Sequence, residues 1–207
     1  MSHAEEDGPR SRPRKEAPPA RLFFGVFTSL QRLFDPVRNA LERRFGPLHP
    51  KEESPLWPFP TTRTYEPTMG PGPFHRKFFF LSENWPQDKL AQVKLATIEI
   101  EEAIQASEAF DLPRVVNIDP GLLNDCRIIL ATTKDHAHRI YRGDGIWEEI
   151  TLVFRGGAYQ PMAWTYPDFR NPDYHAYFAA IRERHLASLL RSSAPQRPPT
   201  PEGPPPP

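Results

Sequence analysis

Strand-like and helical segments follow one another in no regular order along residues 21–190, and this order restricts the fold more than any other feature. Residues 21–29 are a short apolar segment rich in Phe and Val, which predicts a buried strand. Residues 87–110 instead repeat apolar side chains every three or four positions, which predicts an amphipathic helix. A parallel sheet would need a regular strand–helix–strand succession. We therefore predict an α+β fold, a single domain with a mainly antiparallel mixed sheet and helices largely on one face.

Residues typical of caps and turns mark the ends of several elements. Asp35 and Asn171 each precede a helical pattern and are predicted to cap it. Pro120-Gly121 is predicted to turn the chain after a strand. The glycine-rich segments 143–145 and 156–157 are predicted hairpin turns between apolar, β-branched strands.

Both ends of the chain have low complexity, which sets the domain boundaries. Residues 1–20 mix Ser, Pro, Arg and Glu, and residues 191–207 contain eight prolines. We predict disordered tails at 1–20 and 191–207 around one domain at 21–190. The proline-rich connection 47–73 is expected to cross the surface, with its aromatic residues packed onto the domain.

Charge and composition restrict the classes of partner. The 26 basic and 26 acidic residues cancel, so no overall field favours nucleic acid or an anionic membrane, and nucleic acid is an unlikely partner. No apolar segment approaches the roughly 20 residues of a membrane span. The single cysteine, Cys126, excludes an internal disulfide framework. These features predict a soluble, cytoplasmic protein without a membrane partner.

Motifs of high specificity are missing. The sequence contains no G-x-x-x-x-G-K-S/T phosphate loop, no G-x-S-x-G elbow, and neither H-E-x-x-H nor paired C-x-x-C for zinc. The sequence therefore identifies no cofactor and leaves open whether the protein is an enzyme.

Polar residues concentrate within residues 114–154, where the flanking segments are predicted strands. Asn117 and Asp119 share one strand face, and Lys134 and Arg139 follow the next strand. If all four flank one cleft, two cations beside an acid would favour a phosphate or a carboxylate. Asp135 lies in the same cluster, and the alternative for each residue is an ordinary turn or hairpin role.

Acid–base chemistry and metal binding are two further interpretations of this region. Asp119 and His138 are the candidate catalytic pair. His136 and His138 would share one face of an extended segment and could hold a metal with a third ligand, although a structural role for His138 is the alternative.

Three residues outside the region could contact the same ligand. Lys77 lies in a predicted strand, where its stem could be buried and its ammonium directed at a ligand. Lys94 and Thr97 lie close together on the long helix. The alternatives are a solvated Lys-Glu face for Lys94 and a hydrogen bond from Thr97 to a carbonyl one turn earlier.

Several motifs in order resemble the bacterial family of domains of unknown function numbered 4416. They are YEPTMGPG (65–72), KLAT (94–97), VNIDPG (116–121), LATTKDHAHRIY (130–141), GIWEEITLVF (145–154) and WTYPDFRNPDY (164–174). The resemblance covers residues 21–184. The family pattern maps onto Glu66, Met69, Lys94, Thr97, Asn117, Asp119, Lys134, Asp135, His138, Arg139, Tyr141, Tyr166 and Asp168. The resemblance thus adds Tyr141 to the candidate ligand contacts, whereas His136 lies outside the pattern, which counts against a two-histidine metal site.

Three functions follow as hypotheses. In the first, the domain binds, and could act on, a small phosphate-containing or nucleotide-like ligand. In the second, it is a non-catalytic adaptor that binds protein or RNA through segments 47–73 and 164–174. In the third, it is a metal-dependent hydrolase.

Overall fold

The computed structural model describes residues 16–60, 65–108 and 110–193 of the chain. Its centre is one sheet of eight strands, all paired antiparallel, in the order β2-β3-β1-β4-β5-β7-β6, with β8 paired to β7. The strands are β1 (Ala20–Thr28), β2 (Trp57–Phe59), β3 (Phe74–Trp85), β4 (Asn117–Leu123), β5 (Arg127–Thr132), β6 (Ile140–Gly143), β7 (Ile146–Arg155) and β8 (Ala158–Pro161). The predicted α+β fold with a mainly antiparallel sheet is confirmed.

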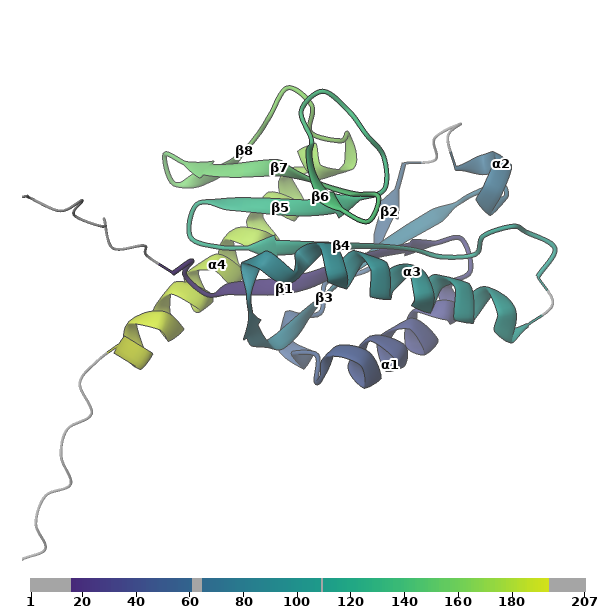
Figure 1. Ribbon diagram of the computed structural model, residues 1–207, viewed down its shortest axis with the longest axis horizontal. Coiled ribbons are helices and arrows are strands. Elements are labelled where there is room, and N and C mark those ends of the chain that lie inside the picture. Colours follow the sequence, from purple (N-terminus) through teal and green to yellow (C-terminus); the bar gives the residue numbers. More distant parts are fainter. Residues whose placement is uncertain (1–15, 61–64, 109, 194–207) are drawn as a thin grey trace, which may run out of the picture.

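Helices cover both faces of this sheet (Figure 1). The α-helices are α1 (Phe34–Phe45), α2 (Glu66–Met69), α3 (Leu90–Ser107) and α4 (Pro172–Ser193), and the short 3-10 helices are η1 (Gln31–Leu33), η2 (Pro50–Glu52), η3 (Gln87–Lys89) and η4 (Asp168–Arg170). Helices α1 and α3 pack on one face and α4 packs on the other, so the helices are divided between the two faces instead of lying largely on one as predicted.

The central strand β1 is buried along its whole length and serves both faces. Leu22, Phe24 and Val26 belong to the core beneath α1 and α3. Phe23 belongs to the core beneath α4, and Phe27 to a smaller aromatic cluster with residues of β2 and β3. Because successive side chains of a strand point to opposite faces, a strand buried on both faces is apolar throughout.

Of the two predicted helix caps, one is confirmed and one is wrong. The Oδ1 of Asn171 accepts a hydrogen bond from the amide of Asp173 at 3.0 Å, as expected at the start of α4. Asp35 does not cap α1, because η1 runs directly into that helix and its first residue is already Phe34. Asp35 is therefore a residue of the first turn, where its charge still suits the helix dipole.

The turn predicted at Pro120-Gly121 is also wrong, because both residues continue β4. β4 pairs with β5 only from Gly121 onward, so the missing amide hydrogen of Pro120 breaks no bond to β5. Gly121 lies where neighbouring groups come close: a Cβ there would be 2.4 Å from Cζ of Phe23 and 2.7 Å from the carbonyl oxygen of Ile129. A pair of residues typical of turns is therefore placed in a strand by packing.

We expect Gly121→Ala to lower the free energy of unfolding by about 2 to 3 kcal/mol, because the added methyl group overpacks a rigid backbone contact. Urea denaturation followed by circular dichroism measures the change. Gly156→Ala is the control, since no atom lies within 4 Å of its added Cβ and its φ is 61°; only backbone strain of about 1 kcal/mol is expected there. A wild-type midpoint for Gly121→Ala would contradict the packing argument.

The predicted tails lie mostly outside the described residues, and the N-terminal boundary differs slightly from the prediction. The carbonyl of Pro18 accepts a hydrogen bond from Gln87, and Ala20 is fully buried at the start of β1. At the other end, α4 continues to Ser193. Within the described ranges, no helix has both the length and the apolar character needed to cross a membrane.

Candidate functional site

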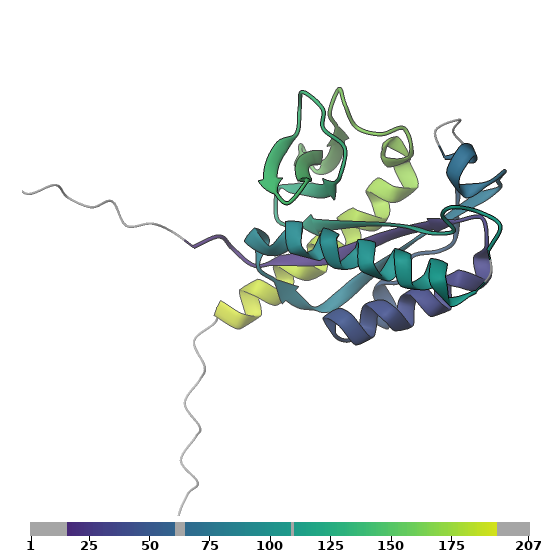
Figure 2. The same ribbon diagram turned by 45° about the vertical axis from the view of Figure 1, so that its right-hand side comes forward.

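A cavity of about 730 Å³ opens where β4 and β5 diverge. Only three residue pairs join these strands, Gly121–Leu123 with Leu130–Ile128, so the first half of β4 has no β5 partner. The cavity is lined by this unpaired half of β4, by α3, by the end of β5 with residues 133–139, and by residues 166–169. In Figure 2 the strands β5 to β8 rise away from the layer of β1, β3 and β4. The volume of the cavity falls within the range of roughly 300 to 1,000 Å³ that is usual for small-ligand sites.

Side chains of α3 replace the missing strand beside β4. The ammonium of Lys94 donates to the carbonyl oxygen of Ile118 at 2.7 Å, and the amide of Ile118 donates to Oε1 of Glu101 at 2.7 Å. Both backbone groups of Ile118 would otherwise be buried without partners. The two side chains therefore keep this edge open to the cavity, which a paired strand would have closed.

Arg114 completes the same edge. Its guanidinium lies 2.8 Å from Oε2 of Glu101 and also donates to Oδ1 of Asn117. The side-chain amide nitrogen of Asn117 has no hydrogen-bond partner among the described residues and is buried. Asn117 is thus oriented by Arg114, and its side-chain amide helps to lower the pKa of Asp119.

Arg76 of β3 is a deeply buried charge of the cavity, with a side chain 3% exposed. Its guanidinium crosses β1 beside Gly25, where a Cβ would lie 3.1 Å from Nη1. It lies 3.3 Å from Oδ2 of Asp119 and 3.4 Å from Oδ2 of Asp168. The absence of a side chain at Gly25 therefore lets one cation join carboxylates from β4 and η4.

Four aromatic rings surround the same guanidinium. The rings of Phe27, Phe59, Phe78 and Phe169 have centroids 4.7 to 5.6 Å from its Cζ. Such cation–π contacts stabilise a desolvated arginine by about 2 kcal/mol or more. Arg76 is held in place on all sides, yet its Nε and Nη1 have no hydrogen-bond partner among the described residues.

The two carboxylates beside Arg76 differ in acidity. Burial raises the pKa of Asp168, and Arg76 offsets this only in part, so the pKa stays above its ordinary value. For Asp119 burial acts in the same direction, but Lys94 and Arg76 outweigh it and lower the pKa. Asp119 is consequently ionised at neutral pH, and a proton binds Asp168 more readily than Asp119.

A second buried ion pair lies on the opposite wall, between Arg139 and Glu149. The distance from Nε to Oε2 is 2.7 Å, and both side chains are 1% exposed. Arg139 also donates to the carbonyl oxygen of Lys134 at 2.7 Å and to the hydroxyl of Tyr166 at 3.1 Å. This one side chain therefore ties together β7, residues 133–139 and the segment after β8.

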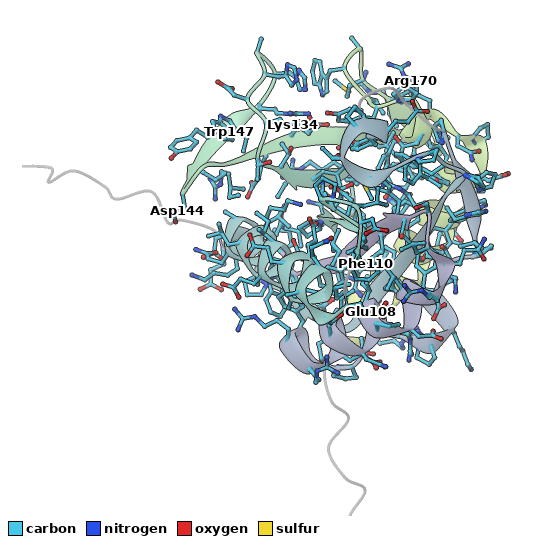
Figure 3. All side chains as sticks on the ribbon, turned by 90° about the vertical axis from the view of Figure 1, so that its right-hand side faces the viewer. Glu108, Phe110, Lys134, Asp144, Trp147 and Arg170 are labelled. Atoms are coloured by element: carbon cyan, nitrogen blue, oxygen red, sulfur yellow. The ribbon has the colours of Figure 1, made fainter. Side chains whose placement is uncertain are left out.

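Lys134 extends from this wall at the rim of the cavity. It is exposed, and its ammonium lies 5.5 Å from the ring centroid of Tyr65. Figure 3 shows it on the same part of the molecule as Trp147, apart from Glu108 and Phe110 beyond the end of α3. Within the described parts of the chain it forms no ion pair, unlike the other basic residues of the cavity.

The model of a family described as Domain of unknown function (DUF4416) matches residues 18–185. The chain belongs to the DUF4416 family. No curated protein and no solved structure matches it. The family predicted from the motifs is thereby confirmed.

Five of the predicted site residues of this DUF4416 domain meet in the cavity. They come from α3, from β4 and from the connection after β5: Lys94, Asn117, Asp119, Lys134 and Arg139. Their roles differ, because Lys94 and Arg139 already make short hydrogen bonds inside the protein, whereas Lys134 is free at the rim. His136, which lies outside the family pattern, also lines the cavity.

Two of the other predicted residues, Lys77 and Tyr141, lie away from the cavity. Lys77 points away from the cavity and pairs with Glu53 at 2.5 Å, because it is adjacent to Arg76 on a strand and so faces the opposite side. Tyr141 is 59% exposed on β6, where it packs against Trp147. The structure therefore does not bring these two residues together with the others in this cavity.

Three further predicted residues are near the cavity but not part of its lining. Thr97 is fully buried and donates to the carbonyl oxygen of Lys94 at 2.8 Å, the structural alternative for this residue. Asp135 is exposed. His138 lies 3.0 Å from Oε2 of Glu149, outside the lining, so the structure does not bring it together with Asp119 as a catalytic pair.

Sequence reasoning missed Arg76, Glu101, Glu149 and Asp168. Arg76 shares a face of β3 with Phe78 and Phe80, but the face of Lys77 is also apolar, so the sequence carried no signal that favoured Arg76. Asp168 belonged to the family pattern without being proposed as a site residue. The role of Glu149 follows only from its contact with Arg139, and the two residues lie on opposite sides of a hairpin.

Proposed function

We propose that this domain binds a small phosphate-containing molecule in the cavity between β4 and β5. The observation that carries the proposal is Lys134. Every carboxylate of the lining lies beside an arginine or lysine, whereas the ammonium of Lys134 forms no ion pair with any carboxylate of the described ranges. An excess positive charge at the rim of a concave site favours an anion.

Unpaired hydrogen-bond donors in the cavity wall support the same proposal. Among the described lining residues, the buried side-chain atoms without a hydrogen bond are Nε and Nη1 of Arg76, Nδ2 of Asn117 and Oδ2 of Asp168, and Nη1 of Arg76 forms an ion pair with that Oδ2 at 3.4 Å. Each buried group left unpaired costs about 1 to 3 kcal/mol. Donors outnumber acceptors among these atoms, which favours a ligand rich in acceptor oxygens, and phosphate offers more of them than a carboxylate does.

No specific observation favours the adaptor or the hydrolase. The aromatic residues of segment 47–73 pack inward against the cores, and in segment 164–174 the 37% exposed Trp164 and Tyr166 form hydrogen bonds with Ile150 and Arg139 inside the protein. In the part of the chain that the structure describes, no group of three or more His, Cys, Asp or Glu side chains is arranged to hold a metal ion. The small-ligand proposal therefore stands without a second candidate.

Titration calorimetry with ribose 5-phosphate tests the proposal. We expect binding to the wild type, and an affinity about ten-fold or more weaker for Lys134→Ala, since a hydrogen bond between charged groups contributes about 1.5 to 3 kcal/mol. Lys51→Ala is the matched control, because Lys51 is an exposed lysine outside the cavity lining. Absence of binding to the wild type, or equal losses in the two variants, would contradict the proposal.

A further inference from the structure

Three flat rings form a parallel stack at the mouth of the cavity. The centroids of His138 and Trp164 lie 5.2 Å apart with an interplanar angle of 11°. Those of His136 and His138 lie 5.7 Å apart with an angle of 6°. Offset stacking at such distances is a favourable arrangement of aromatic rings. The stack runs from the segment after β8 to residues 133–139, and His136 is its last ring.

The rings of His138 and Trp164 are fixed by hydrogen bonds to β7. The indole nitrogen of Trp164 donates to the carbonyl oxygen of Ile150 at 2.9 Å, and Nε2 of His138 lies 3.0 Å from Oε2 of Glu149. Glu149 is itself held by Arg139 at 2.7 Å. The stack is therefore a rigid feature of the wall, which reduces the entropy lost when another ring is added to it.

His136 differs from His138 and Trp164 in its contacts. It is exposed and lines the cavity, and only the ring of His138 stacks on it among the described residues. It also lies two residues after Lys134, the cation to which the proposed function assigns the phosphate. A planar ring and a cation that forms no ion pair among the described residues thus line the same cavity.

We propose that the ligand carries a planar nucleobase that extends this stack on His136 while its phosphate reaches Lys134, which makes the ligand a nucleoside phosphate. This inference rests on the proposed function. Every nucleobase has a π face, so stacking selects a base without requiring a particular one. Nothing in the stack itself reads the edge of the base.

The test compares AMP with ribose 5-phosphate, which carries the same phosphate without the base, by titration calorimetry. For the wild type we expect AMP to bind about 5-fold to 100-fold more tightly, the range that stacking on one ring supplies. His136→Ala should remove this preference and leave the affinity for ribose 5-phosphate unchanged. His136→Phe should retain the preference, because it keeps a flat ring but no ring nitrogen.

The outcomes separate the two proposals. Equal affinities of the wild type for AMP and ribose 5-phosphate would overturn the stacking inference and leave the phosphate site in place. A preference that survives in His136→Ala would also overturn it, since the base would then bind elsewhere. If neither compound binds, the proposed function fails, and the inference fails with it. His75→Ala, which removes a histidine that contacts Gln31 away from the cavity, should behave as the wild type.

Discussion

Arg76→Met is expected to lower the free energy of unfolding by about 3 to 5 kcal/mol, the usual effect of removing one partner from a buried ion pair. Methionine fills the space of the stem but leaves Asp119 and Asp168 without the cation between them. The lost contacts include 3.3 Å and 3.4 Å ion pairs, and the Asp168 side chain is 7% exposed. Asp168 would be a buried charge without its cation, and Asp119, whose side chain is 27% exposed, would keep only Lys94 at 3.9 Å, so Asp168 accounts for most of the loss.

Urea denaturation of the wild type and of two variants measures this effect. Arg44→Met is the matched control, because Arg44 is 55% exposed and its ion pair with Glu99 at 3.5 Å lies on the surface. We expect less than about 1 kcal/mol there. The triple variant Arg76→Met, Asp119→Asn, Asp168→Asn should recover part of the stability, since no buried charge is then left unpaired at this site. Equal losses for Arg76→Met and Arg44→Met would contradict the assignment of Arg76 as the central charge of the cavity.

The loss at Arg76 should also depend on pH. In the wild type the pKa of Asp119 is lowered, so its contribution to stability is present above its unfolded-state pKa of about 3.9 and is lost as pH falls through the lower folded-state pKa. Without Arg76, both carboxylates should titrate at higher pH, because the neutral acid is the cheaper form to bury. The difference in unfolding free energy between wild type and Arg76→Met should therefore be smaller at about pH 4 than at pH 7. A difference that grows on acidification would show that the charges are not its cause.

The elements that could be predicted from the sequence are those with local signals. The apolar segment of β1, the periodic face of α3 and the hairpin glycines of residues 143–145 and 156–157 each determine their structure with little help from distant residues. Pro120-Gly121 shows the limit of such signals. The residue types of Pro120-Gly121 are compatible with a turn and with a strand. The pair lies in a strand because of the way β4 diverges from β5, which the sequence does not show.

The centre of the site could not be predicted in the same way, because it depends on contacts across the sheet. The sequence around Arg76 and Lys77 is apolar on both faces of β3, so its alternation did not show which of the two cations faces the cavity. Arg76 reaches Asp119 only by crossing a third strand at Gly25. The cluster near residues 117–139 was found because its residues are close in sequence. The charges that organise it come from β3, α3, β7 and η4.

Glu149→Gln is expected to lower the free energy of unfolding by about 3 kcal/mol or more, since it leaves the buried guanidinium of Arg139 without its carboxylate. Glu148→Gln is the neighbouring control. The side chain of Glu148 is 15% exposed, and its partner Arg142 is 39% exposed, so an effect of less than about 1 kcal/mol is expected. Urea denaturation of both variants gives the comparison, and equal effects would contradict a special role for the Arg139–Glu149 pair.

The same variant distinguishes two ways in which Glu149 could affect an anion at Lys134. By charge alone, removing a carboxylate from the cavity wall should strengthen the binding of a phosphate. The contacts of Arg139 predict the opposite, because it holds the carbonyl of Lys134 and the hydroxyl of Tyr166 while Glu149 holds Arg139. In Glu149→Gln these contacts would be looser, and the rim of the cavity would have to be ordered when the ligand binds, which costs entropy. We therefore expect Glu149→Gln to bind ribose 5-phosphate more weakly than the wild type. Calorimetry at a temperature where circular dichroism shows the variant folded decides the sign, and tighter binding would mean that Glu149 acts on the site through its charge and not by positioning Lys134.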